Sequence, residues 1–233
     1  MKLSICIPTY NRARHLNNCL NSICIAAENS SLNYEVCISD NGSADNTEEI
    51  ARNYLDKLPL KYHRNPENLG IPKNFLNVVS MGSGEFAWLV GDDDLLTPDA
   101  LTRIEHLLSK NTDIDFFFTN AYHLNTDYLR GKQEPINTKD ISFPLDKFSK
   151  YETEGELSFL ELIDPKVSFD FLGGMFLSIF RREKWLENTE KLNKESLSSE
   201  ELFSHFDNTF PHVKIFSNAF ANHRSRTIRL CSR

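Results

Sequence analysis

The chain has 233 residues, of which 40% are hydrophobic and 25% charged, and this length and composition allow one large domain with a sizeable core. Its formal net charge of -7 argues against a nucleic-acid partner, because a surface that binds nucleic acid is normally basic. No stretch approaches the ~20 apolar residues of a membrane span and the N-terminus is too polar for a signal peptide, so we expect a cytoplasmic protein.

The first 120 residues predict an alternation of strands and helices. Short β-branched and aromatic runs are typical of strands, and apolar residues three or four positions apart are typical of helices. We expect strands at residues 3–8, 34–40, 60–65, 86–90 and 114–120. We expect helices at residues 12–23, 46–58 and 71–82, and a fourth from Thr97 as N-cap, with Pro98 at the first helical position, to Ser109. This alternation predicts an α/β fold with a mainly parallel central sheet and helices on both faces.

From residue 121 on, the pattern is less regular. Residues 124–156 are polar and rich in turn-forming residues, and we expect them to form loops. Residues 173–188 predict a strand that leads into a helix. Residues 200–220 predict a helical stretch that is interrupted at Pro211.

Polar side chains follow three of the predicted strands. They are Thr9-Tyr10-Asn11-Arg12 after the first strand, Asp40-Asn41-Gly42 after the second and Asp92-Asp93-Asp94 after the fourth. In open α/β sheets the carboxyl ends of the strands share one edge, and ligands bind there. We therefore expect the three polar groups to meet at one edge of the sheet.

Three consecutive carboxylates repel one another by about 1 kcal/mol or more per close pair. A turn or a helix start could account for such a run, but Thr97 and Pro98 already provide the expected helix start. The alternative is a hard-cation site, because Mg²⁺ and Mn²⁺ bind through carboxylates together with substrate phosphates. Such an ion would offset the repulsion and neutralise the charge on a departing diphosphate. We interpret residues 92–94 as a metal site shared with a phosphate ligand.

Four segments follow one another in the first 120 residues: ICIPTYNRARHLNNCLNSI, YEVCISDNGSADNTEEIA, RNPENLGIPKNFLNVV and FAWLVGDDDLLTPDAL. In this order and at this spacing they resemble the family 2 glycosyltransferases of the nucleotide-diphospho-sugar transferase (GT-A) fold. The similarity is greatest to bacterial O-antigen sugar transferases of the abequosyltransferase type. GGMFLSIFRREKW and FPHVKIF resemble the second half of that subgroup.

This resemblance implies a metal-dependent glycosyltransferase. The donor would be a nucleotide-diphosphate sugar, and the acceptor a hydroxyl of a saccharide or lipid-linked saccharide in bacterial surface polysaccharide synthesis. Residues 1–120 would form the nucleotide-sugar-binding half. Residues 121–233 would form the acceptor-side half of the same domain, with C-terminal truncation left open. Peripheral contact with the cytoplasmic face of the inner membrane would suit such an acceptor.

The resemblance also implies roles for single residues. The nucleotide-sugar-binding residues would be Pro8, Thr9, Arg12, Asp40, Asn68, Asn74 and Asp92. Asp40 would accept a hydrogen bond from the base, and Asp92 would bind ribose or sugar hydroxyls. Asp93, with Asp94 as a second contact, would bind the Mn²⁺ or Mg²⁺ cofactor. The frequent family pattern is Asp-any-Asp-Asp, and Gly91 stands where its first Asp would be, so fewer carboxylates are expected around the metal.

Glycosyl transfer to a hydroxyl needs a group that removes the acceptor proton. Inverting members of the family use an acidic residue from the second half, and Asp207 is our candidate, with Glu200 and Glu201 as weaker ones. Whether the anomeric configuration is retained stays open. A truncated or degenerate chain that binds nucleotide without catalysis is the non-enzymatic alternative. A sugar-phosphate nucleotidylyltransferase is disfavoured, because that class needs a glycine-rich loop after the first strand and residues 8–15 contain no glycine.

Overall fold

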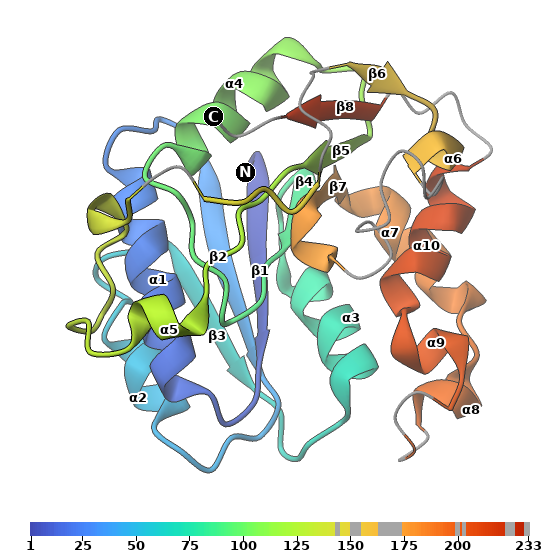
Figure 1. Cartoon of the computed structure of the whole chain (residues 1–233). Helices are drawn as coiled ribbons and strands as arrows, with labels where there is room; N and C mark the ends of the chain where they lie inside the picture. The colour runs from blue at the N-terminus through green and yellow to red at the C-terminus, as the bar shows by residue number, and fades with distance from the viewer. Residues whose placement is uncertain are drawn as a thin grey trace.

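One mixed sheet runs through the part of the chain that the computed structural model describes, which is residues 1–142, 145–149, 155–162, 174–198, 201, 204–221 and 227–230. Its strands are β1 (Leu3–Thr9), β2 (Tyr34–Asp40), β3 (Leu60–Arg64), β4 (Phe86–Leu89), β5 (Phe116–Thr119), β6 (Glu156–Leu157), β7 (Ser178–Arg181) and β8 (Thr227–Leu230). Their order in space is β3-β2-β1-β4-β7-β5-β8-β6 (Figure 1). β1 pairs in parallel with β2 and β4, and β2 with β3.

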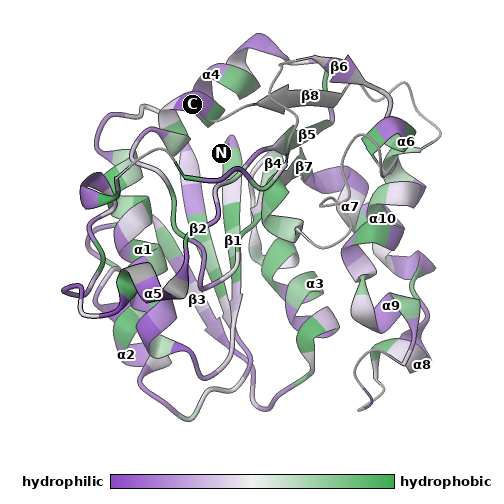
Figure 2. Ribbon diagram, in the orientation of Figure 1, coloured by the Kyte–Doolittle hydropathy of each residue, from purple (hydrophilic) through white to green (hydrophobic). Residues whose placement is uncertain are grey.

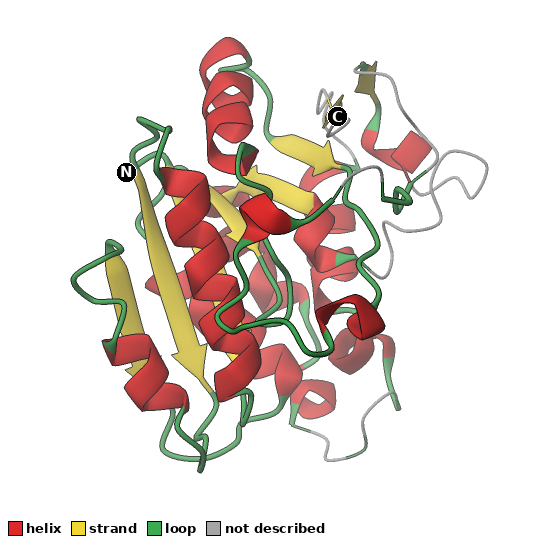
Figure 3. Ribbon diagram, turned by 60° about the vertical axis from the view of Figure 1, so that its left-hand side comes forward, coloured by secondary structure: helices red, strands yellow, loops and turns green. Residues whose placement is uncertain are grey.

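Helices cover both faces of this sheet, as Figures 1 and 3 show. They are α1 (Ala13–Ala27), α2 (Thr47–Arg52), α3 (Ile71–Met81), α4 (Ala100–Lys110), α5 (Thr126–Leu129), α6 (Phe159–Leu162), α7 (Arg182–Asn188), α8 (Lys194–Leu197), α9 (Phe206–Thr209) and α10 (Pro211–Phe220). Short 3₁₀ turns occur at Thr138–Asp140, Met175–Leu177 and Thr189–Lys191. None of the described helices is both long enough and apolar enough to cross a membrane.

The core lies in two layers because successive side chains of a strand point to opposite faces. Ile5 and Ile7 of β1 pack in the cluster that contains most of the buried apolar residues of α1 and those of α4. Cys6, between them, packs in the cluster that contains residues of α3, α7 and α10. Figure 2 shows α1, α4 and α10 with both green and purple stretches, as expected of helices that bury one side and expose the other. All seven residues of β1 are buried, so β1 is the central strand that places the site.

The predicted α/β fold with a mainly parallel sheet is confirmed, and two of the predicted helices differ in their bounds. The sheet also contains antiparallel pairs, since β7 from the second half of the chain pairs antiparallel with both β4 and β5. The helix expected at residues 46–58 ends at Arg52 and continues as turns. The helix expected from Thr97 begins at Ala100, because the Thr97 hydroxyl bonds to the Asp99 carboxylate in a preceding turn and caps no helical amide.

In the second half of the chain, one segment contains more secondary structure than the sequence predicts, and another agrees with the prediction. The loop expected at residues 124–156 contains α5, a 3₁₀ turn and the start of β6. Within the helical stretch expected at residues 200–220, the described part contains two helices, α9 and α10, and Pro211 is the first residue of the second, as the sequence predicts. Glu200 lies outside the described residues.

Candidate functional site

The three polar segments predicted to meet do so at the carboxyl edge of the sheet. Thr9, at the end of β1, donates a hydrogen bond from Oγ1 to Asp92 Oδ2 at 2.7 Å. The backbone N–H of Asn11 donates to Ser43 Oγ at 2.8 Å, which ties the loop after β1 to the loop after β2. Asn11 has a positive φ of 54°, so the chain reverses sharply before Arg12. The parallel pairing of β1 with β2 and β4 brings these loops together.

Arg12 joins two carboxylates of the loop that follows β4, whose residues 92–94 we call the acidic loop. Its Nε lies 3.1 Å from Asp92 Oδ1, and its Nη2 lies 2.7 Å from Asp93 Oδ2. The Asp92 side chain is only 6% exposed, whereas those of Arg12 and Asp93 are 43% and 51% exposed. One guanidinium therefore supplies the counter-charge that makes two adjacent carboxylates tolerable.

Asp94 is held by a backbone amide of its own turn. Its Oδ2 accepts a hydrogen bond from the N–H of Gly91 at 2.8 Å, which closes a tight turn. Burial, together with the charges of Asp93 and Asp92, raises the pKa of Asp94 to about 7. Burial also raises the pKa of Asp92, although the Thr9 hydroxyl and Arg12 oppose this.

Gly91 fits this turn because it has no side chain. A Cβ at this position would lie 2.8 Å from both Asp93 Oδ1 and Asp94 Oδ2, so a side chain here would displace both carboxylates. Glycine at position 91, where the frequent family pattern has its first Asp, thus allows the observed positions of the Asp93 and Asp94 carboxylates.

Asp92 and Asp93 have the chemistry of a hard-cation site. They already converge on one cation, the Arg12 guanidinium, and Asp93 is open to solvent. Within the described residues no group of three or more His, Cys, Asp or Glu side chains is arranged to hold a metal. Mg²⁺ and Mn²⁺ commonly bind through only one or two carboxylates and complete their shell with water and phosphate oxygens. Two convergent carboxylates fit that requirement, whereas Oδ2 of Asp94 is bonded to the Gly91 amide.

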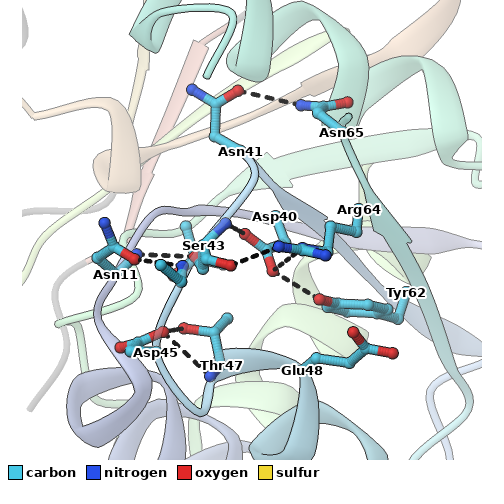
Figure 4. A network of polar contacts seen from close by, with 12 residues as sticks. Asn11, Asp40, Asn41, Ser43, Asp45, Thr47, Glu48, Tyr62, Arg64 and Asn65 are labelled. Atoms are coloured by element: carbon cyan, nitrogen blue, oxygen red, sulfur yellow. Dashed lines mark hydrogen bonds and ion pairs between the residues drawn. The ribbon is translucent and has the colours of Figure 1, made fainter. Parts of the chain in front are cut away.

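Asp40 lies at the centre of the polar network in Figure 4. It is fully buried, and its Oδ1 accepts from the N–H of Ser43 at 2.8 Å while its Oδ2 accepts from the Tyr62 hydroxyl at 2.6 Å. Arg64 Nε lies 4.0 Å from Oδ2, and its Nη2 donates to the Ser43 carbonyl. Asp40 therefore fixes the loop after β2. Its predicted hydrogen bond to a nucleotide base stays a prediction.

Asparagine amides fix the neighbouring loop. Asn41 Nδ2 donates to Asn68 Oδ1 at 2.7 Å, and Asn65 Nδ2 donates to Asn41 Oδ1 and Asn74 Oδ1 at 3.1 and 3.2 Å. Asn74 is buried, and its Nδ2 donates to the Ser39 carbonyl at 3.0 Å. The predicted pocket residues Asn68 and Asn74 are thus brought together through Asn41 and Asn65. Asn41 belongs to a polar group that the sequence places at this edge, whereas Asn65 was missed, and its position directly after β3 is the signal that could have found it.

The remaining predicted residues lie as follows. Pro8 is buried within β1, so any contact it makes with a nucleotide would be at the end of that strand. Asp207 lies in α9, where its Oδ2 accepts from the Asn193 N–H at 2.7 Å and from Lys214 Nζ at 2.6 Å. Burial would raise the pKa of Asp207, but Lys214 and the Asn193 N–H lower it below its usual value. These contacts belong to α8, α9 and α10, and no role in the acidic loop follows from them.

Part of the chain is similar in sequence to known glycosyltransferases and polysaccharide synthases. Abequosyltransferase RfbV of Salmonella typhimurium is 44% identical over 118 residues, which are 49% of this chain and 34% of that protein. Chondroitin synthase of Escherichia coli is 33% identical over 208 residues, covering 79% of this chain and 28% of the relative. The chain thus spans about a third of the length of these curated relatives or less.

Solved structures share the fold. The crystal structure of Staphylococcus aureus TarS 1–349 aligns with a TM-score of 0.70 and 22% identity, over 100% of this chain and 59% of that one. TarS 1–349 has also been solved in complex with UDP and with UDP-GlcNAc. This likeness confirms the expected GT-A fold. A family model described as glycosyl transferase family 2 matches residues 4–169, and the chain belongs to that family.

Proposed function

We propose that this chain transfers a sugar from a nucleotide-diphosphate donor to a hydroxyl of a saccharide or lipid-linked saccharide, with Mn²⁺ or Mg²⁺ as cofactor. The observation that carries the proposal is the convergence of Asp92 and Asp93 on one cation at the carboxyl edge of the sheet. Ligands of open α/β sheets bind at this edge. The family supports sugar transfer, and the complexes of TarS with UDP and UDP-GlcNAc support a nucleotide-sugar donor.

The chain's own residues divide the work as follows. Asp93 would hold the metal ion, which when bound neutralises negative charge on the leaving diphosphate. We propose Asp92 as its partner ligand, in place of the ribose or sugar contact expected from the sequence, because Asp92 and Asp93 converge on one cation. Thr9 keeps Asp92 oriented through its hydroxyl. Arg12 supplies a second positive charge in the same part of the site. Pre-positioned charges of this kind stabilise a leaving group without reorganisation during the reaction.

Two loops would form the donor pocket. The Asp40 network holds the loop after β2, and the amides of Asn41, Asn65 and Asn74 hold the loop that contains Asn68. We propose that the nucleotide lies against these loops, with Asp40 and Asn68 nearest the base and sugar. Asp94 is retained as a second metal contact, through the oxygen that does not accept from the Gly91 N–H.

The acceptor assignment rests on the relatives. The similarity to a Salmonella abequosyltransferase supports an acceptor from bacterial surface polysaccharide synthesis. A lipid-linked acceptor would bring the chain to the cytoplasmic face of the inner membrane. For removal of the acceptor proton we retain Asp207 as the candidate base. A chain that binds nucleotide without turnover is the competing proposal.

A thermal-shift panel tests the donor and the metal together. UDP, CDP, GDP and dTDP are added with and without Mn²⁺, and bound ligand raises stability by about 2.7 kcal/mol at a hundredfold excess over its dissociation constant. We expect one or two diphosphates to stabilise the chain, and Asp93→Asn to remove the metal-dependent part. A full metal-dependent shift in Asp93→Asn would contradict the proposed ligand. Product formation from labelled donor sugar then separates an enzyme from a nucleotide-binding chain.

A further inference from the structure

The acidic loop is neutralised by a cation that belongs to the chain itself. The backbone on both sides of Arg12 is anchored, since the Asn11 N–H donates to Ser43 Oγ at 2.8 Å and the Ala13 N–H donates to Asp45 Oδ2 at 3.0 Å. The Arg12 side chain, in contrast, is 43% exposed. Arg12 thus combines a fixed backbone with a long side chain that has room to leave its carboxylate partners.

The oxygens of Asp92 determine whether a metal and Arg12 can bind at once. Asp92 Oδ2 is occupied by the Thr9 hydroxyl at 2.7 Å, and the side chain is only 6% exposed, so it has little freedom to rotate. Its other oxygen, Oδ1, faces Arg12 Nε at 3.1 Å. A divalent cation held by Asp92 and Asp93 therefore needs the oxygen and the space that the guanidinium occupies.

We propose that Arg12 is an exchangeable counter-ion of the metal site. It holds Asp92 and Asp93 together in the metal-free chain, and it leaves Asp92 Oδ1 when a divalent cation binds. The displaced guanidinium is then free to neutralise charge on the diphosphate. This inference rests on the proposed function, because it concerns the metal site proposed there, and it adds competition between Arg12 and the metal.

Mn²⁺ binding to the nucleotide-free chain tests the inference directly. Free Mn²⁺ is followed by electron paramagnetic resonance during titration of the wild-type chain and Arg12→Gln. We expect Mn²⁺ to bind Arg12→Gln about fivefold more tightly, the factor that corresponds to a partly exposed ion pair of about 1 kcal/mol. Arg12→Lys keeps a competing positive charge without the guanidinium fork, so the Mn²⁺ affinity of this variant should lie between those of the wild-type chain and Arg12→Gln.

Arg14→Gln is the matched control. Arg14 lies two residues along the chain, its side chain is 70% exposed, and it pairs with Glu134. This variant removes the same charge without touching the acidic loop. We therefore expect its Mn²⁺ affinity to stay within about twofold of the wild-type value, because long-range effects between exposed charges are screened by salt.

The outcomes distinguish this inference from the proposed function. Equal Mn²⁺ affinity in wild type and Arg12→Gln, a weaker affinity in Arg12→Gln, or no Mn²⁺ binding in either chain would overturn the exchange. If a diphosphate still stabilises the chain in an Mn²⁺-dependent way under those results, the proposed function stands and only the exchange fails. If neither Mn²⁺ nor any diphosphate binds, the proposed function fails with it.

Discussion

Thr9 and Asp92 are joined by a buried hydrogen bond of 2.7 Å, although 82 residues of chain separate them. The bond links the last residue of β1 to the first carboxylate after β4, and so fixes the acidic loop to the central strand. Because it uses Asp92 Oδ2, it also decides that Oδ1 is the oxygen left for a cation.

We expect Thr9→Val to lower both the free energy of unfolding and the metal-dependent thermal shift. Valine keeps the shape of threonine but leaves Asp92 Oδ2 buried without its donor, which costs about 1–3 kcal/mol. Chemical denaturation measures that loss, and the thermal-shift panel measures the metal-dependent stabilisation, which should also fall. Thr9→Ser keeps the hydroxyl and is the control. An unchanged metal-dependent shift in Thr9→Val would mean that the orientation of Asp92 is set elsewhere.

The asparagine network makes a prediction about the donor pocket. Asn65→Ala removes the donor to Asn41 and Asn74, so those buried oxygens each lose a partner and the loop that contains Asn68 loses support. We expect a loss of about 1–3 kcal/mol in unfolding free energy and a smaller thermal shift with the preferred diphosphate.

Asn77→Ala is the matched control for that experiment. Asn77 reaches the network only through its Nδ2, which lies 3.3 Å from Asn65 Oδ1. Its replacement should leave diphosphate binding nearly unchanged. If Asn77→Ala and Asn65→Ala reduced binding equally, the internal amides would not be what positions the loop.

Much of this site follows from the order of strands and helices. Runs such as LSICIP and YEVCISD are rich in β-branched and apolar residues, so the strands that place Thr9, Asp40 and Asp92 are predictable, as is the edge at which they meet. The turn after residue 94 was not predictable, because the choice between Thr97 and Ala100 as helix start depends on a side-chain contact with Asp99. The antiparallel insertion of β7 depends on pairing between distant segments, which local sequence patterns do not encode.

The sequence also could not predict which side chains of the site contact one another. Arg12 was expected near the nucleotide, and its ion pairs with Asp92 and Asp93 arise only when loops about 80 residues apart are placed together. The hydrogen bond from the Tyr62 hydroxyl to Asp40 likewise depends on the register of β2 and β3.

Glu35 should control stability in acid. Burial alone would raise its pKa, but Lys61, the Ser83 N–H and the hydroxyls of Ser4 and Ser83 more than offset this and lower it to about 2. A carboxyl whose folded pKa is depressed stabilises the fold above its unfolded pKa, and that stability is lost as the pH falls through the folded pKa. Because the Glu35 side chain is only 2% exposed, water screens its interactions weakly. The lowered pKa of Glu35 therefore corresponds to at most about 3 kcal/mol of unfolding free energy.

The measurement is unfolding free energy from pH 7 to pH 2 for wild type and Glu35→Gln. The wild-type curve should fall between about pH 5 and pH 2, whereas the Glu35→Gln variant should be less stable at pH 7 and flatter over the same range. Parallel curves for the two chains would show that other carboxylates govern acid unfolding.

Asp207 and Lys214 provide the sharpest test of the candidate base. If Asp207 removes the acceptor proton, Asp207→Asn should lower kcat by about 100-fold or more without changing the KM for the donor, since general-base catalysis contributes about 10²–10⁴. Lys214→Gln breaks the same ion pair but keeps the carboxylate, whose pKa then rises because Lys214 lowers it in the wild-type chain. A carboxylate with a higher pKa is a stronger base, so Lys214→Gln should retain far more activity than Asp207→Asn. Equal losses of kcat in the two variants, matched by equal losses in unfolding free energy, would assign Asp207 to the packing of α9 against α10 and leave the base to another residue.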